Sequence, residues 1–399
     1  MLKLLQSIFS GKTGVHESPT PSETPEIPPE AVSIDGAAPF PFSSHITIDN
    51  QFPYVDWAAV EAWIAELPSN ETQGRAWSMC ERAWLLHFRT ALGSSYQLAE
   101  AGDAMLISSL EPNVARATLE FMNLTLQRIV HALNGVATVP ESGSDILIVF
   151  DDYDDYYKYI SHYYPEQGEF AGSSGMYLHS GCSHFVTVKS DLQVIEPVIV
   201  HEMTHGCVAH LPLPAWLNEG IAVNMELRLG HAGSPLYTPR EMHQKHLKFW
   251  GQPEIQEFWS GKSFLRSDEG SMLSYDLARI IVEQMAKDWE AFRNFVLAAD
   301  RADGGSTAAS EHLGVGLGEC VCAILEIEES SGWEPDPNLW DSDPEKGGFS
   351  ARGTENCCRH DVRHPHANAH SARLRLAGIL VNADLCIVVD EKDSCLTSA

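Results

Sequence analysis

The sequence predicts an α+β fold, in which a helical region precedes a small mixed sheet and further helices follow it. Apolar residues recur at helical spacing in three early stretches, residues 57–67, 76–91 and 114–133. The period then changes, and residues 146–150 are a short continuous apolar run that is typical of a buried strand. Two more strands are expected at residues 176–178 and 184–188. Helical spacing returns over residues 195–210, 215–229 and 271–285.

The chain is predicted to have four parts. Residues 1–43 are rich in Pro, Ser, Thr and Glu and are expected to be disordered or extended, with ordered structure beginning near Ile46. Residues 44–140 are predicted to form a helical region that packs on a domain at residues 141–329, within which residues 231–262 are expected to be irregular. Residues 330–399 are predicted to be a weakly ordered extension.

The extension leaves two alternatives open. Residues 379–389 could add a strand to the domain. A second metal site is also possible, although the spacing of the cysteine and histidine residues here matches no familiar zinc pattern. These residues are Cys357, Cys358, His360, His364, His366 and His370.

Composition favours a soluble globular protein, with 44% apolar and 20% charged residues. The formal net charge of −29, from 26 basic and 55 acidic residues, argues against nucleic acid or an anionic membrane as partner. It is compatible with cationic peptides, but a solubilising acidic surface is the favoured explanation. No run reaches the roughly 18 apolar residues of a membrane span.

The expected location is cytoplasmic. The apolar patch at residues 1–9 is broken by Lys3 and Gln6, so it does not resemble a secretory signal, although a peripheral amphipathic N-terminus stays open. The nine cysteines form no paired framework, and most are expected to be reduced thiols.

The pattern that carries chemistry is His201-Glu202-Met203-Thr204-His205. On a helix, residues four apart lie on one face, so His201 and His205 can present imidazoles to one metal ion. Glu202 lies beside that face and can hold a water molecule as general base. The competing hypothesis is a buried amphipathic helix whose histidines are satisfied by their neighbours. His179 and His184, on the preceding strands, are expected to have ordinary solvent-facing or core roles.

A third ligand is predicted downstream. Thirteen residues separate His205 from Glu219, enough to end one helix, turn through a loop and begin another. A carboxylate on that second helix would complete a three-ligand site and leave a fourth position for water, which is typical of catalytic rather than structural zinc.

Together, the HExxH pattern and the segment Trp216-Leu217-Asn218-Glu219-Gly220 resemble the gluzincin metallopeptidases. The short spacing is most similar to the bacterial peptidase-MA-like family. The resemblance implies a zincin-like catalytic domain with Zn²⁺ held by His201, His205 and Glu219. Gly220 has poor helix propensity, which suggests close packing at that position.

The resemblance also implies roles for other segments. Residues 185–189 would edge the cleft and pair with an extended substrate. Tyr275 would donate a hydrogen bond to the oxyanion, with a packing role as the alternative. Thermolysin-like members carry an acidic partner for a zinc histidine four residues after the ligand glutamate, but Val223 stands there, so this partner is not predicted.

The predicted function is zinc-dependent hydrolysis of peptide bonds in a peptide or protein substrate. Gly175-Met176-Tyr177-Leu178 lacks the glutamate with which related aminopeptidases capture a free amine, so an endopeptidase or narrow processing peptidase is favoured. A metal-stabilised binding or scaffold module is the alternative, and Glu202 argues against it because a structural metal needs no general base. Hydrolysis of a non-peptide bond is a third hypothesis. The sequence predicts neither substrate identity nor oligomeric state.

Overall fold

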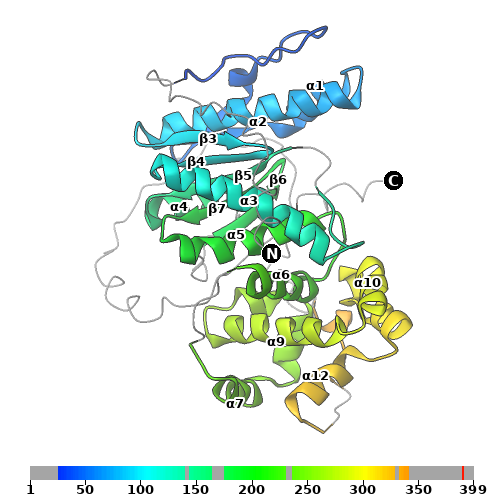
Figure 1. Ribbon diagram of the computed structural model, residues 1–399. Coiled ribbons are helices and arrows are strands. Elements are labelled where there is room, and N and C mark those ends of the chain that lie inside the picture. Colours follow the sequence, from blue (N-terminus) through cyan, green and yellow to red (C-terminus); the bar gives the residue numbers. More distant parts are fainter. Residues whose placement is uncertain are drawn as a thin grey trace, which may run out of the picture.

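A mixed sheet lies between two layers of helices in the computed structural model, which describes residues 26–139, 143–163, 175–230, 236–328, 332–340 and 389–390 (Figure 1). The strand order is β3-β4-β5-β7-β6-β8. β4, β5 and β7 are parallel, β3 and β6 run antiparallel to their inner neighbours, and β8 runs parallel to β6. The strands are β3 (Gln97–Ala101), β4 (Ala104–Ser108), β5 (Asp145–Phe150), β6 (Gly175–Ser180), β7 (Cys182–Val188) and β8 (Val389–Asp390).

Both faces of the sheet are buried, as the central strand β5 demonstrates. Ile146, Ile148 and Phe150 pack in one apolar cluster, while Leu147 and Val149 pack in the other. This division follows from the alternation of side chains along a strand. On the first face lie α1 (Trp57–Ala65), α2 (Asn70–Leu92), α4 (Tyr153–Ile160) and a separate hairpin of β1 (Ile46–Asp49) and β2 (Phe52–Val55). On the second face lie α3 (Pro112–Ala132) and α5 (Leu192–Val208).

A further group of helices packs beyond α5, in the lower half of Figure 1. α6 (Ala215–Leu229) lies between α5 and α9 and contacts both. The other helices of this group are α7 (Pro239–Phe249), α8 (Gln252–Trp259), α9 (Glu269–Met285), α10 (Trp289–Ala298), α11 (Ser306–Ala308) and α12 (Leu317–Leu325). Several begin at capping side chains: Thr238 and Glu241 form a reciprocal capping box on α7, and Asp268 accepts a hydrogen bond from Gly270 N at α9.

The mixed α+β class is confirmed. The helices expected at residues 57–67, 76–91, 114–133 and 271–285 correspond to α1, α2, α3 and α9, and the three expected strands correspond to β5, β6 and β7. Residues 231–262 are not irregular throughout, because their described part contains α7 and α8.

The predicted boundary at residue 140 divides a continuous sheet. Residues 44–140 contain four strands besides their helices, and β4 pairs in parallel with β5 across that boundary. Ordered structure also begins earlier than Ile46. Val32 and Phe40 form a β-bridge, and Phe42 is fully buried. The sheet therefore joins the two parts into one body.

Part of the C-terminal extension also packs on the helices, where Trp333 is buried and its carbonyl accepts a hydrogen bond from Trp259 Nε1. The cysteine and histidine residues from Cys357 to His370, and most of the strand considered at residues 379–389, lie outside the described residues.

Within the described ranges, no single helix has both the length and the apolarity of a membrane span. One pair, Ser306–Leu313 and Leu317–Leu325, reaches them only jointly and is bent by 81°.

Gly220 confirms the close packing that its low helix propensity suggested. A Cβ at this position would lie 2.6 Å from the backbone oxygen of Ala278 on α9 and 2.7 Å from Val282 Cγ2. The obstacle is backbone, which cannot rotate away as a flexible side chain can. Glycine therefore sets the distance between α6 and α9.

We predict that Gly220→Ala lowers the free energy of unfolding by about 1–3 kcal/mol, because the added methyl group overpacks this contact. Gly74→Ala is the matched control, since Gly74 also lies in a helix but has no atom within 4 Å of the place where a methyl group would lie. That control should be neutral or stabilise the protein by up to about 1 kcal/mol. Urea unfolding measures the free energy of unfolding of both variants. Equal changes in the two variants would contradict the close contact at Gly220.

Candidate metal centre

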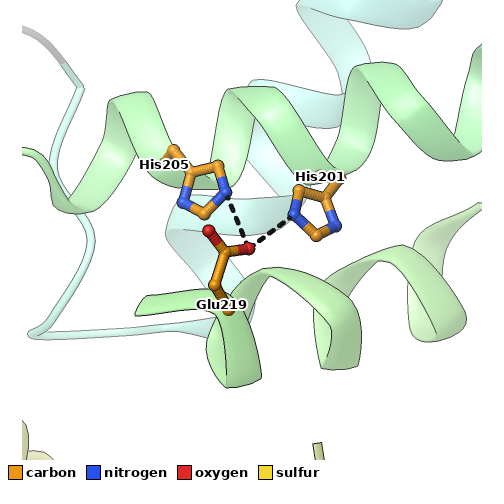
Figure 2. Close-up of side chains that lie close together, drawn as sticks. All are labelled: His201, His205 and Glu219. Carbon is orange, nitrogen blue, oxygen red and sulfur yellow. Dashed lines mark hydrogen bonds and ion pairs between the residues drawn. The ribbon is translucent and has the colours of Figure 1, made fainter. Parts of the chain in front are cut away.

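Two adjacent helices bring the predicted ligands together. His201 and His205 lie one turn apart on α5, whose other positions, including Ile199 and Met203, pack in the apolar core beneath the sheet. Glu219 lies in the second turn of α6. All three side chains converge between the helices (Figure 2). They are buried, with 1% of His201, 1% of His205 and 4% of Glu219 exposed.

The distances fit a single small ion. Glu219 Oε2 lies 3.2 Å from His201 Nε2 and 3.4 Å from His205 Nε2. One ligand atom from each residue lies within 4.8 Å of the other two. Among the described residues, this is the one group of three or more His, Cys, Asp or Glu side chains that converges in this way.

The chemistry of the donors also fits a metal ion. His205 Nε2 is buried and makes no hydrogen bond of normal geometry, although a carboxylate oxygen lies 3.4 Å away. A buried ring nitrogen without such a bond is rare and points to another partner. Two imidazole nitrogens and one carboxylate oxygen are a donor set that holds Zn²⁺ with one position left for water.

Electrostatics at the group favour a cation. Burial lowers the pKa of His201, but its hydrogen bonds to Glu219 and Glu226 outweigh that effect and raise the pKa well above its ordinary value. Burial raises the pKa of Glu219, but the adjacent His205 and His201 outweigh it and hold the pKa low. Without an ion, the buried carboxylate is thus balanced by positive charge on imidazole. A divalent ion held by neutral imidazoles would supply the same balance.

The second ring nitrogen of each histidine also has a partner. His201 Nδ1 lies 3.0 Å from Glu226 Oε2, and His205 Nδ1 lies 2.9 Å from Asn218 Oδ1. An acceptor there fixes the ring orientation and directs Nε2 toward the shared centre. The sequence left this partner unassigned because Val223 occupies the position where the resemblance placed an acid. The partner is Glu226, one turn further along α6.

Glu202 follows His201 directly on α5. It is fully buried, and a Cβ built on Gly175 would lie 3.3 Å from Glu202 Oε1 and 2.2 Å from Val198 Cγ1. The start of β6 therefore passes directly over the α5 face that carries Val198 and Glu202. No side chain larger than hydrogen fits between strand and helix at this point.

Tyr275 is also near the group. It lies on α9 with 8% of its surface exposed, and its ring centroid is 6.4 Å from that of His201. It also makes a T-shaped contact with Phe264, at 5.0 Å between ring centroids. The structure thus brings together His201, His205 and Glu219, with Tyr275 near His201 and with Glu202 next to His201 on α5.

The prediction that residues 185–189 edge the cleft is wrong. β7, which contains most of residues 185–189, lies between β5 and β6, so neither of its sides is free to pair with a substrate. β6 lies outside it, and β8 lies beyond β6, where it pairs with Leu178 and His179.

His184 has an ordinary core role, as expected. Its Nε2 lies 2.7 Å from Tyr159 Oη, its Nδ1 lies 2.8 Å from the carbonyl of Cys182, and burial lowers its pKa to about 4. Tyr159 packs in the cluster on the opposite face of the sheet from α5. The side chain of His179 lies outside the described part of the chain.

We predict that Glu226→Ala weakens zinc binding by about 10–100-fold, because His201 loses the acceptor that orients its ring. Glu290→Ala, at an exposed position on α10, is the control and should bind zinc as the wild type does. Competition with a chromophoric chelator measures both affinities. Unchanged affinity of the Glu226 variant would contradict the orienting role, and no binding by the wild type would contradict the site.

Comparisons of the chain with protein-family models, with curated proteins and with solved structures found no match. The resemblance to gluzincins therefore rests on the residues quoted above, and the function has to be argued from the geometry of the site.

Proposed function

We propose that this protein is a zinc-dependent peptidase of the gluzincin type, with a zincin-like catalytic region formed by the sheet, α5, α6 and α9. One observation carries the proposal: His201, His205 and Glu219 converge in a buried place, and Glu202 lies on the same helix beside them. A structural ion would need the three ligands but not the buried carboxylate next to them.

His201, His205 and Glu219 would hold the ion. Bound there, zinc would lower the pKa of a water molecule toward about 7 and polarise the substrate carbonyl. Glu202 accepts a proton from the attacking water and passes it to the leaving amine. Tyr275 donates a hydrogen bond to the oxyanion that forms at the scissile carbonyl. Glu226 and Asn218 keep the two imidazoles in place throughout.

The substrate would bind near the start of β6. Gly175 brings this part of the strand onto Glu202, since a Cβ at this position would lie 3.3 Å from Glu202 Oε1. A peptide bound there would place its scissile bond beside the general base.

The burial of the site supports a narrow substrate range. Between 0% and 4% of each of the four central side chains is exposed, so a bulky folded substrate cannot reach them directly. An extended segment is the substrate geometry that fits best. The absence of a glutamate from Gly175-Met176-Tyr177-Leu178 favours cleavage within a chain over removal of its first residue.

We predict that Glu202→Gln retains zinc but lowers the rate of peptide cleavage at least about 100-fold, because the attacking water loses its base. The measurement combines metal analysis with cleavage of a broad peptide library, and Glu290→Gln is the control. An unchanged rate of cleavage in the Glu202 variant would contradict the mechanism. Bound zinc without cleavage by the wild type would instead favour the binding module.

Tyr275→Phe is predicted to lower kcat by about 100–1,000-fold with little change in KM, because the hydroxyl acts on the oxyanion and not on the bound substrate. Zinc content and unfolding midpoint should match the wild type, since the ring still packs on Phe264. An unchanged kcat would assign Tyr275 a packing role alone.

A further inference from the structure

A groove with a volume of about 440 Å³ lies away from the metal centre, between the C-terminal end of α3 and helices α6, α9 and α10. Volumes from about 300 to 1,000 Å³ are usual for sites that bind small molecules. Most of the groove lining is apolar: Ala132, Leu133, Ile221, Met225, Leu227, Val282, Ala286, Trp289 and Phe292. Its base is therefore suited to a hydrocarbon chain or ring.

The charged side chains of the groove have an unusual balance. Three of the four are basic, Arg228, Arg279 and Lys287, and the fourth is Glu283. Across the whole chain, acidic residues outnumber basic ones by 55 to 26. A basic rim is therefore contrary to the overall charge, and it would attract an anion that most of the surface repels.

Two of these cations are not neutralised by carboxylates of the described residues. Arg279 is paired with Asp276 and Glu283, at 2.8 and 2.9 Å. Lys287 Nζ donates instead to the neutral side-chain amide of Gln284. Arg228 is exposed and forms no ion pair with any described residue. Arg228 and Lys287 thus offer uncompensated positive charge beside an apolar base.

The groove and the metal centre use different faces of α6. Glu219 and Glu226, seven residues apart, share the face toward α5. Ile221, Met225 and Arg228 line the groove. Because none of the metal-binding side chains lines the groove, a ligand there would not be part of the hydrolytic site.

We propose that this groove binds a small amphipathic carboxylate, with its apolar part on Leu133, Met225 and Phe292 and its carboxylate at the basic rim. The guanidinium of Arg228 can bind a carboxylate through two parallel N–H donors, which a neutral head group cannot match. The proposal is independent of the proposed peptidase function, because it concerns binding and not cleavage.

The test is calorimetric titration of the full-length protein with decanoate, compared with decanol as a neutral analogue of equal chain length. Decanoate should bind at least about tenfold more tightly than decanol. Arg228→Glu and Lys287→Glu should each weaken decanoate binding by at least about tenfold and leave decanol binding unchanged. Lys248→Glu, an exposed substitution on α7, is the matched control and should bind as the wild type does.

Either of two results would overturn the proposal. One is equal affinity for decanoate and decanol; the other is equal weakening of decanoate binding by the control and the rim substitutions.

A third arm of the experiment uses an apolar tripeptide with a free carboxyl terminus. Binding of that peptide without binding of decanoate would overturn the choice of a small carboxylate and assign the groove to a peptide end. Unfolding midpoints of all variants ensure that loss of binding is not loss of fold.

Discussion

The contact between α5 and α6 is the constraint on which the candidate site depends. It buries two imidazoles and a carboxylate, and an unpaired charge in such a place is strongly destabilising. The structure compensates with a connected set of partners. Glu219 is placed against both histidines, Glu226 accepts from His201, and Asn218 accepts from His205. These partners satisfy most of the buried polar atoms of the group. His205 Nε2 is the exception, because it makes no hydrogen bond of normal geometry.

The surrounding layers hold these helices in place. α5 lies between the sheet and α6, and α6 lies between α5 and α9, so neither helix can move without disturbing an apolar interface. Two glycines set the critical separations. Gly175 lets β6 approach Glu202, and Gly220 lets α9, with Tyr275, approach α6. The candidate site residues thus come from helices held close to their neighbours at two glycines, by side chains of α5 at Gly175 and by the backbone of α9 at Gly220.

How much could be predicted from the sequence depended on whether the relevant geometry is local. His201 and His205 were predictable because a helix of known pitch places residues four apart on one face. Glu226 was not, because the resemblance directed attention to Val223. Glu226 lies seven residues after Glu219, which places the two side chains on one face of a helix, two turns apart. That spacing was the available signal. The order of β6 and β7 was also missed, since pairing between strands is set by the whole fold and not by either strand. β3 and β1 were missed because both are short, contain no fully buried residue and lack a strong apolar pattern.

α6 is the element that connects these observations. Its buried residues include Trp216, Leu217, Glu219, Ile221 and Met225, which point in several directions around the axis, so this helix is central and not amphipathic. One face holds the carboxylates of the candidate metal centre, Gly220 meets α9, and Met225 and Arg228 border the groove. A single helix therefore supplies side chains to both places, and this explains why its buried residues surround the axis.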